Sequence, residues 1–145
     1  MENNLNRILI GNGAIVFLIA MLAGFYYAVA ILDSAASDNA FRVAHSGTMA
    51  QGLLLIGMGS GLNYLNFKYL TKKIISWLLI ITAWGNTIGY NIAALSGSRG
   101  LTYFDTTHGS GLVNKFVFAS FMIAVVTILV ALIFIIVGAF KKETK

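Results

Sequence analysis

A single histidine stands at the head of a long apolar stretch, in the sequence AHSG at residues 44–47. Polar residues follow His45 within two helical turns: Ser46, Thr48 and Gln51. An imidazole can transfer protons or bind a metal ion near neutral pH. An ionisable side chain within a membrane segment is rare and is by default a candidate for function. His45 is therefore the first residue at which we look for chemistry.

A second polar block, TAWGNTIGY, occupies residues 82–90 of another apolar stretch. Thr82, Asn86 and Tyr90 are spaced four residues apart, which places them on one face of a helix. Hydrogen-bonding side chains at membrane depth usually face the protein interior rather than lipid. The block therefore predicts a polar helix face that points toward a neighbouring helix.

The two polar blocks meet if their helices run antiparallel. Tyr90 then lies at the depth of His45, and Asn86 lies near the level of Gln51, about 9 Å further along, because a helix rises about 1.5 Å per residue. Each residue also has a structural interpretation: the histidine can bond water, the tyrosine can belong to an aromatic belt, and the amides can bridge helices. Together, at one depth, they favour a pocket in the outer half of the bilayer.

The composition limits what such a pocket can do. The chain has no cysteine, which excludes disulfides, thiolate metal sites and thiol catalysis. A metal held by side chains alone needs three or four ligands, and the only other histidine, His108, stands beside Asp105 in a loop. One histidine is enough to hold a haem iron with an open sixth position, whereas two protein ligands suit electron transfer. The composition permits haem without selecting it.

Four apolar segments must position these residues. The chain has 145 residues, of which 58% are hydrophobic and 10% charged, whereas soluble domains carry about a quarter charged residues. Each segment is near or above the roughly 20 residues that span a bilayer, and spanning segments of this kind form helices. We therefore predict an all-α integral membrane protein, a single domain over residues 1–145, with helices at about 7–32, 41–67, 74–95 and 112–140. Gly57 and Gly61 would let the second helix pack closely against another.

Lysine and arginine residues predict the orientation of these helices. With a cytoplasmic N-terminus, the outer side holds three of them and the inner side holds seven: Arg7, Lys68, Lys72, Lys73, Lys141, Lys142 and Lys145. This excess predicts an antiparallel bundle with both termini cytoplasmic. We further expect a multi-pass protein of the bacterial inner membrane. The net charge of +5 then reflects topology and contact with anionic lipid, and we expect no nucleic-acid partner.

Three sequence blocks resemble the styrene oxide isomerase family: AHSG at 44–47, WGNTIGY at 84–90 and RGLT at 99–102. GNG at 11–13 adds support. The likeness covers the second and third apolar segments and the loop after them. The related hydroxylaminobenzene mutases have a similar size and four-span layout, and match these blocks less well.

The resemblance implies a homotrimer of four-helix protomers, with haem b near the subunit interface. It implies conversion of aryl epoxides to aldehydes by a 1,2-shift, without net redox change. His45 would be the axial ligand of a ferric haem iron. Tyr90 would help to position the epoxide, and Asn86 would be a further polar wall of the pocket. Arg99, in the matching loop, would serve either structure or a haem propionate.

Two positions depart from the family pattern. Gln51 stands where the family has an asparagine, so the amide is kept but reaches one methylene further. Thr82 stands where the family has an aspartate, so a charge is lost. Both positions belong to the predicted catalytic pocket, together with Asn86 and Tyr90. The departures bear on the native substrate more than on the fold or the haem site.

The leading hypothesis is a haem b-dependent membrane isomerase that acts on apolar epoxides by Lewis-acid ring opening and a 1,2-shift. Such substrates partition into the lipid bilayer, and a dry pocket would prevent water from trapping a cationic intermediate. One alternative is an arylhydroxylamine mutase. Another is a non-catalytic haem-binding or electron-transfer protein, for which His108 is the available second ligand. The last is a structural membrane protein without a cofactor.

Overall fold

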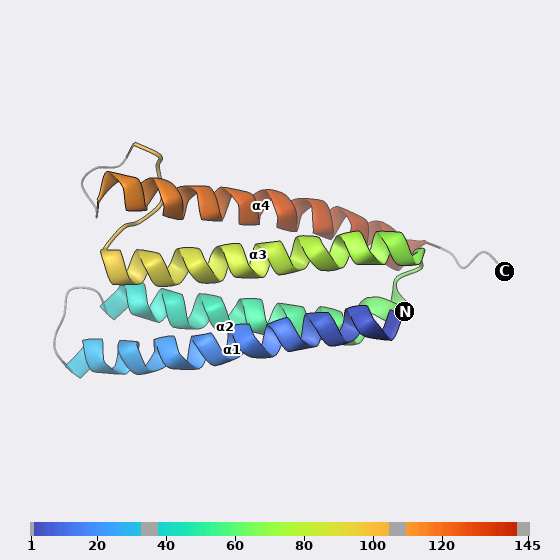
Figure 1. Cartoon of the computed structure of the whole chain (residues 1–145), viewed down its shortest axis with the longest axis horizontal. Coiled ribbons are helices and arrows are strands. Elements are labelled where there is room, and N and C mark those ends of the chain that lie inside the picture. The colour runs from blue at the N-terminus through green and yellow to red at the C-terminus, as the bar shows by residue number, and fades with distance from the viewer. Residues whose placement is uncertain (1, 33–37, 105–109, 142–145) are drawn as a thin grey trace.

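The computed structural model describes residues 2–32, 38–104 and 110–141. Four long helices lie side by side (Figure 1), and their bounds are α1 Glu2–Leu32, α2 Asp38–Gly61, α3 Tyr69–Ser96 and α4 Gly111–Phe140. A short 3₁₀ helix, η1 Leu62–Tyr64, follows α2. Within these ranges the chain forms no strand, so the predicted all-α class is confirmed.

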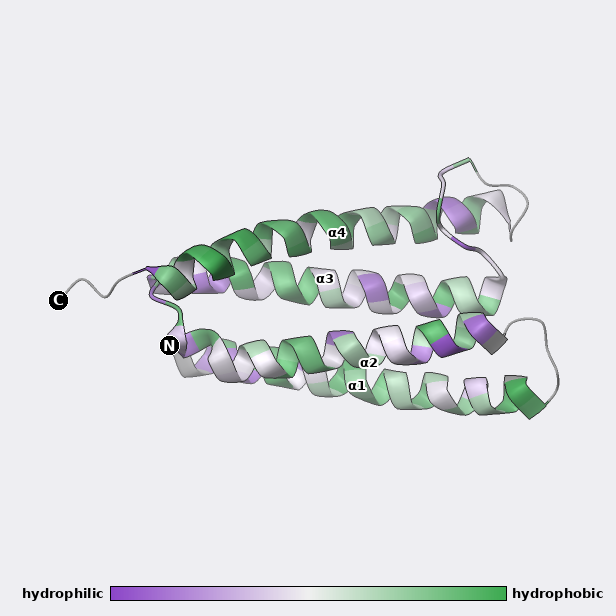
Figure 2. Cartoon of the chain, turned by 180° about the vertical axis from the view of Figure 1, so that it is seen from behind, coloured by the Kyte–Doolittle hydropathy of each residue, from purple (hydrophilic) through white to green (hydrophobic). Residues whose placement is uncertain are grey.

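Three of the helices are long and apolar enough to cross a membrane: Asn4–Val29 within α1, Tyr69–Ser96 and Gly111–Phe140. α4 is apolar along nearly its whole length, whereas α2 alternates between apolar and polar residues (Figure 2). α2 does not meet the same standard because it carries the histidine, the glutamine and several hydroxyl side chains. Three of the four predicted spans are therefore supported, and the crossing by α2 stays a prediction.

The C-terminal end of α2 differs from the predicted bound. We expected this helix to run to about Phe67, but it ends at Gly61. The chain continues through η1 and turns extended at Leu65, where φ is −80° and ψ is 127°. Glycine and asparagine both lower helix propensity, and they are frequent here: Gly57, Gly59, Gly61, Asn63 and Asn66. The early end is the result of this composition.

Glycines bring α1 and α2 close together. A β-carbon on Gly13 would lie 2.8 Å from the carbonyl oxygen of Gly52, and one on Gly52 would lie 3.0 Å from the carbonyl oxygen of Gly13. The prediction that Gly57 and Gly61 form the close-packing face is wrong within this chain, because no atom lies within 4 Å of a β-carbon built on either. The contacting glycine further along α2 is Gly59, which meets the first turns of α1.

α3 lies between α2 and α4 and carries most of the buried polar links. Asn91 donates a hydrogen bond of 3.2 Å to the Thr48 hydroxyl on α2. On the opposite side, the hydroxyls of Thr82 and Thr127 lie 2.8 Å apart and join α3 to α4. These pairs join the middle of α3 to the middle of α4 and the last third of α3 to the middle of α2. The colour along the chain shows that it passes along neighbouring helices in opposite directions (Figure 1).

The apolar core fills one half of the bundle, at the end where α1 begins and α4 finishes. Its buried side chains are Leu5, Leu9, Val16, Leu55, Leu62, Leu65, Ile75, Leu79, Ile80, Ala83 and Ala131. The predicted site residues lie mainly toward the other end. This division leaves the polar half of the bundle for chemistry and the apolar half for stability.

Candidate functional site

The His45 ring lies in the seam between α1 and α2. Its Nδ1 atom is 2.7 Å from the carbonyl oxygen of Ala20. The ring rests against the bare backbone of Gly24, where a β-carbon would lie 2.9 Å from Nδ1. The side chain is half-buried. A carbonyl and a glycine on α1 therefore fix the position of the imidazole.

The Ala20 carbonyl also determines the tautomer of His45. A carbonyl oxygen only accepts hydrogen bonds, so Nδ1 carries the proton and the Nε2 lone pair remains. Nε2 is neither fully buried nor hydrogen-bonded to any residue that the structure describes. Histidines that bind metals usually donate their other ring N–H to a carbonyl or carboxylate in this way. His45 thus fits the requirements of an axial haem ligand.

Tyr90 lies beside α2, at the level of the histidine. A β-carbon on Gly47 would lie 2.7 Å from the Tyr90 ring, and the centroid of that ring is 5.2 Å from the centroid of Phe121 on α4. Gly47 and His45 are two residues apart, which corresponds to a rotation of roughly 200° about a helix axis. The structure therefore brings Tyr90 and His45 to one level but on different sides of α2.

Asn86 and Gln51 lie about one turn from this contact. Asn86 is half-buried, and its amide has no hydrogen bond to a described residue. Gln51 follows Gly47 by four residues, so it projects from the same side of α2 toward α3. Its Oε1 atom is buried without a partner, whereas its Nε2 atom is neither bonded within the described chain nor fully buried. Tyr90 and Gln51 thus share the α2/α3 side of the bundle, and Asn86 lies in the row on α3 between Thr82, which faces α4, and Tyr90.

Thr82 stands apart from these three residues. Its side chain is 1% exposed, faces α4, and bonds both Thr127 and the Leu78 carbonyl, at 2.8 Å and 2.9 Å. Four residues advance a helix by roughly 400°, so a row with this spacing drifts by about 40° at each step. By Tyr90 the row has turned away from α4 toward α2. The role that the resemblance implies for Thr82 stays a prediction.

Arg99 is exposed in the segment after α3 and makes no hydrogen bond with the rest of the described chain. Its proposed contact with a haem propionate stays a prediction. His108 lies outside the described residues. Among those that are described, no three His, Cys, Asp or Glu side chains cluster as metal ligands would. His45 is therefore the one described histidine that can hold iron.

One polar link was missed by the spacing argument. The indole N–H of Trp84 donates a 2.9 Å hydrogen bond to the Asn12 side chain, which joins α3 to α1. Asn12 lies in the GNG block and Trp84 in the WGNTIGY block. The available signal was an amide within the first apolar segment, because an amide away from water requires a hydrogen-bond partner.

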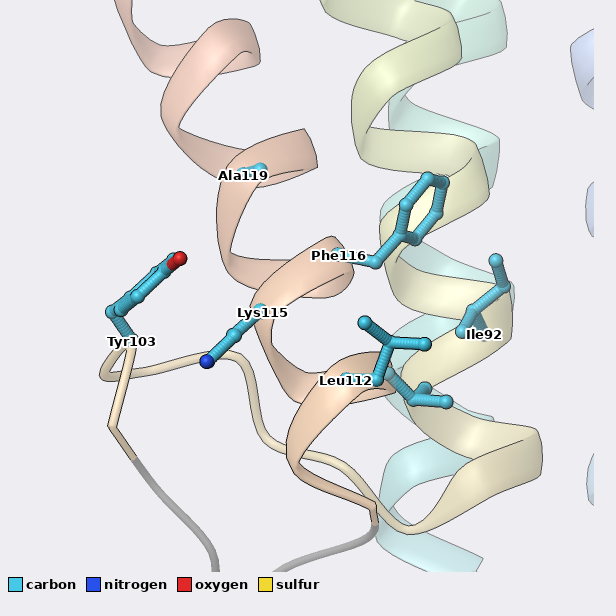
Figure 3. A pocket seen from close by; sticks show the side chains of 7 residues that line it. Ile92, Tyr103, Leu112, Lys115, Phe116 and Ala119 are labelled. Atoms are coloured by element: carbon cyan, nitrogen blue, oxygen red, sulfur yellow. The ribbon is translucent and has the colours of Figure 1, made fainter.

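A separate pocket of about 630 Å³ lies between α3, α4 and the segment after α3 (Figure 3). Ile92 and Phe116 line one side of it. On the other side the Lys115 ammonium group lies 5.0 Å from the centroid of the Tyr103 ring. None of the predicted site residues lines this pocket. The site predicted from the sequence and this pocket are therefore separate parts of the bundle.

The sequence comparison agrees with the motifs. The sequence model of the styrene oxide isomerase family matches residues 5–140, which is most of the chain. No curated protein matches closely enough to count as a relative. The matched range contains every predicted site residue, from His45 to Arg99. The chain therefore belongs to the styrene oxide isomerase family.

Proposed function

We propose that this chain is a haem b-dependent membrane isomerase that converts apolar aryl epoxides to carbonyl compounds. The observation that carries the proposal is the state of His45. Its Nδ1 atom is used by the Ala20 carbonyl at 2.7 Å, and its Nε2 atom is left available. In a chain of the styrene oxide isomerase family, this is the arrangement that an axial ligand requires.

His45 would hold the haem, and Arg99 is the candidate for a propionate that the resemblance implies. Haem b, when bound, would supply a ferric Lewis acid for opening the epoxide. The protein keeps the imidazole in one tautomer through Ala20 and in one place through Gly24. A fixed ligand orientation is the contribution that surrounding residues typically make to metal affinity.

Three side chains of α2 and α3 would hold the oxygen of the epoxide. The Tyr90 hydroxyl and the amide N–H groups of Asn86 and Gln51 are hydrogen-bond donors without partners in the described chain. Such donors stabilise the negative charge that develops on an oxygen as its C–O bond opens. The Phe121 ring, which packs on Tyr90, provides an apolar wall that keeps water away.

The assembly is part of the proposal, because the histidine and the oxygen-binding donors lie on different sides of α2. We therefore include in the proposal the homotrimer that the family implies, with haem near the subunit interface. We further propose that α2 crosses the membrane with the other helices. The chain would then form an antiparallel four-span bundle in the bacterial inner membrane, with both termini cytoplasmic.

The direct test is turnover of styrene oxide by the purified, haem-loaded protein without added reductant. We expect phenylacetaldehyde as the product. Tyr90→Phe should lower kcat/KM by at least about tenfold, because it removes one donor to the developing oxyanion. Tyr103→Phe removes a hydroxyl outside the site and should leave turnover unchanged.

Two outcomes would count against the proposal. If the loaded protein leaves a panel of aryl and alkyl epoxides untouched, the substrate class is wrong. If the same preparation instead rearranges an arylhydroxylamine to an aminophenol, the mutase hypothesis replaces the isomerase. Equal losses in Tyr90→Phe and Tyr103→Phe would show that Tyr90 does not bind the reacting oxygen.

A further inference from the structure

Thr87 carries a buried hydroxyl that, unlike most hydroxyls on these helices, does not donate to the carbonyl four residues earlier. It is 2% exposed, and its Oγ1 atom has no hydrogen bond in the described chain. The other hydroxyls along these helices that donate to the carbonyl four residues earlier are Ser46, Ser60, Ser76, Thr82, Ser96, Ser120 and Thr127. A buried hydroxyl without a partner is costly and requires an explanation.

The second buried oxygen without a partner in this region is Oε1 of Gln51. Its position relative to Thr87 follows from the hydrogen bond between Asn91 and Thr48. Thr87 lies one turn before Asn91 on α3, and Gln51 lies one turn after Thr48 on α2. Because the two helices run in opposite directions, both steps lead the same way along the seam. By this register, Thr87 and Gln51 stand at one level along the seam between α2 and α3.

The chemistry of these two atoms defines what can lie between them. The amide oxygen of Gln51 only accepts, whereas the Thr87 hydroxyl both donates and accepts. The two groups are not hydrogen-bonded to each other. A single water molecule can donate to the amide oxygen and accept from the hydroxyl, which satisfies both.

We propose that Thr87 is a positioning residue of the active site, acting on Gln51 through one buried water. The hydroxyl and the water hold the Gln51 oxygen inside the seam, so the carboxamide N–H₂ group points toward the side that carries Asn86 and Tyr90. Without this link the carboxamide can rotate by half a turn and present its oxygen to the oxygen of the substrate. The inference rests on the proposed function, because the orientation of Gln51 matters only if its N–H₂ group binds that oxygen.

Thr87→Val tests the link, since valine keeps the shape of threonine and removes the hydroxyl. We expect kcat for styrene oxide to fall by about tenfold, as for other residues that orient a catalytic group. The thermal midpoint of unfolding should fall as well, because the water loses a partner. Thr87→Ser keeps the hydroxyl and should retain both quantities. Ser76→Ala removes another buried hydroxyl from α3, one bonded within its own helix, and should leave turnover unchanged.

The double variant Thr87→Val with Gln51→Leu separates an indirect role from a direct one. If Thr87 acts through Gln51, the double variant is no slower than Gln51→Leu alone. If the losses in kcat of the two single variants multiply in the double variant, the proposal is overturned. Full turnover with a raised thermal midpoint in Thr87→Val would also overturn it, because that is the result expected when an unpaired hydroxyl is removed. If the wild-type protein turns over no epoxide, the proposed function fails and the positioning role fails with it. The thermal midpoints of Thr87→Val, Gln51→Leu and the double variant still report whether the link between Thr87 and Gln51 exists.

Discussion

At the scale of single residues, the imidazole of His45 is held by two features of α1. The Ala20 carbonyl accepts from Nδ1 at 2.7 Å, and the bare backbone of Gly24 makes room for the ring. A hydrogen bond of this kind fixes the ring orientation and raises the basicity of the opposite nitrogen. The proposed haem ligand on α2 thus depends for its position on backbone atoms of α1.

Gly24→Ala should weaken haem retention. The added β-carbon would lie 2.9 Å from Nδ1 and 3.0 Å from Cε1, so the ring has to move and its bond to Ala20 weakens. We expect about a tenfold loss of haem affinity, measured from the ratio of haem to protein absorbance during titration. Gly11→Ala is the matched control, because no atom lies within 4 Å of a β-carbon at that position of α1. Equal haem affinity in both variants would mean that Gly24 does not support the ring.

The spacing of the polar residues predicted their depth along the helices better than the side of the helix on which each one lies. Tyr90 and His45 do lie at one level, as antiparallel helices require. Their sides of α2 could not be predicted, because the rotation of a helix about its axis depends on which face packs closely. Here the His45 ring packs against Gly24 of α1 on one side of α2, and the Tyr90 ring packs against Gly47 on another side of α2. A row with a four-residue spacing also drifts around the helix, which separates Thr82 from Tyr90.

At the scale of elements, hydropathy predicted where the helices lie in the sequence. The glycine spacing did not predict which residues form the contacts between them. α3 and α4 begin and end within a few residues of the predicted bounds, because apolar runs of this length form helices in lipid. The G-x-x-x-G spacing at Gly57 and Gly61 did not identify a contact within the chain. The glycines that meet are Gly13 and Gly52. Small residues permit close packing on any face, and the partner helix decides which face is used.

Asn114→Ala should destabilise the junction between α3 and α4. The fully buried Asn114 side chain accepts from the Gly100 N–H at 2.9 Å and donates to the Thr102 carbonyl at 2.7 Å. Alanine leaves both backbone groups without a partner, which costs roughly 1–3 kcal/mol. Thermal or denaturant unfolding measures the loss. Ser120→Ala, whose hydroxyl bonds only within α4, should leave the midpoint nearly unchanged; equal midpoints for both variants would contradict the role of Asn114.

At the scale of the whole molecule, the polar helix α2 lies between two others. α1 covers one of its sides through Gly13 and Gly24, and α3 covers another through Asn91 and Tyr90. A helix packed in this way places Thr48 and Gln51 against protein rather than lipid, which lowers the cost of carrying polar residues across a bilayer. This placement is the physical argument for a fourth span that composition alone does not support.

Reporter fusions test whether α2 crosses. With four spans and a cytoplasmic N-terminus, a reporter fused after Asn66 lies in the cytoplasm and one fused after Thr102 lies outside. We expect a green fluorescent protein to be fluorescent after Asn66, and an alkaline phosphatase to be active after Thr102. If α2 stays on one side of the membrane, Asn66 lies outside and Thr102 lies in the cytoplasm. The fluorescent protein would then be dark after Asn66, and the phosphatase would be inactive after Thr102. The lysines at 68, 72 and 73 favour the first pattern.

The measurement that tests the central claim most directly is the absorption spectrum of the protein purified from haem-replete cells. The account predicts a Soret band that is lost in His45→Ala and kept in His108→Ala, because the Nε2 atom of His45 is the proposed iron ligand. A colourless wild-type protein, or a band of equal intensity in His45→Ala, would contradict the account.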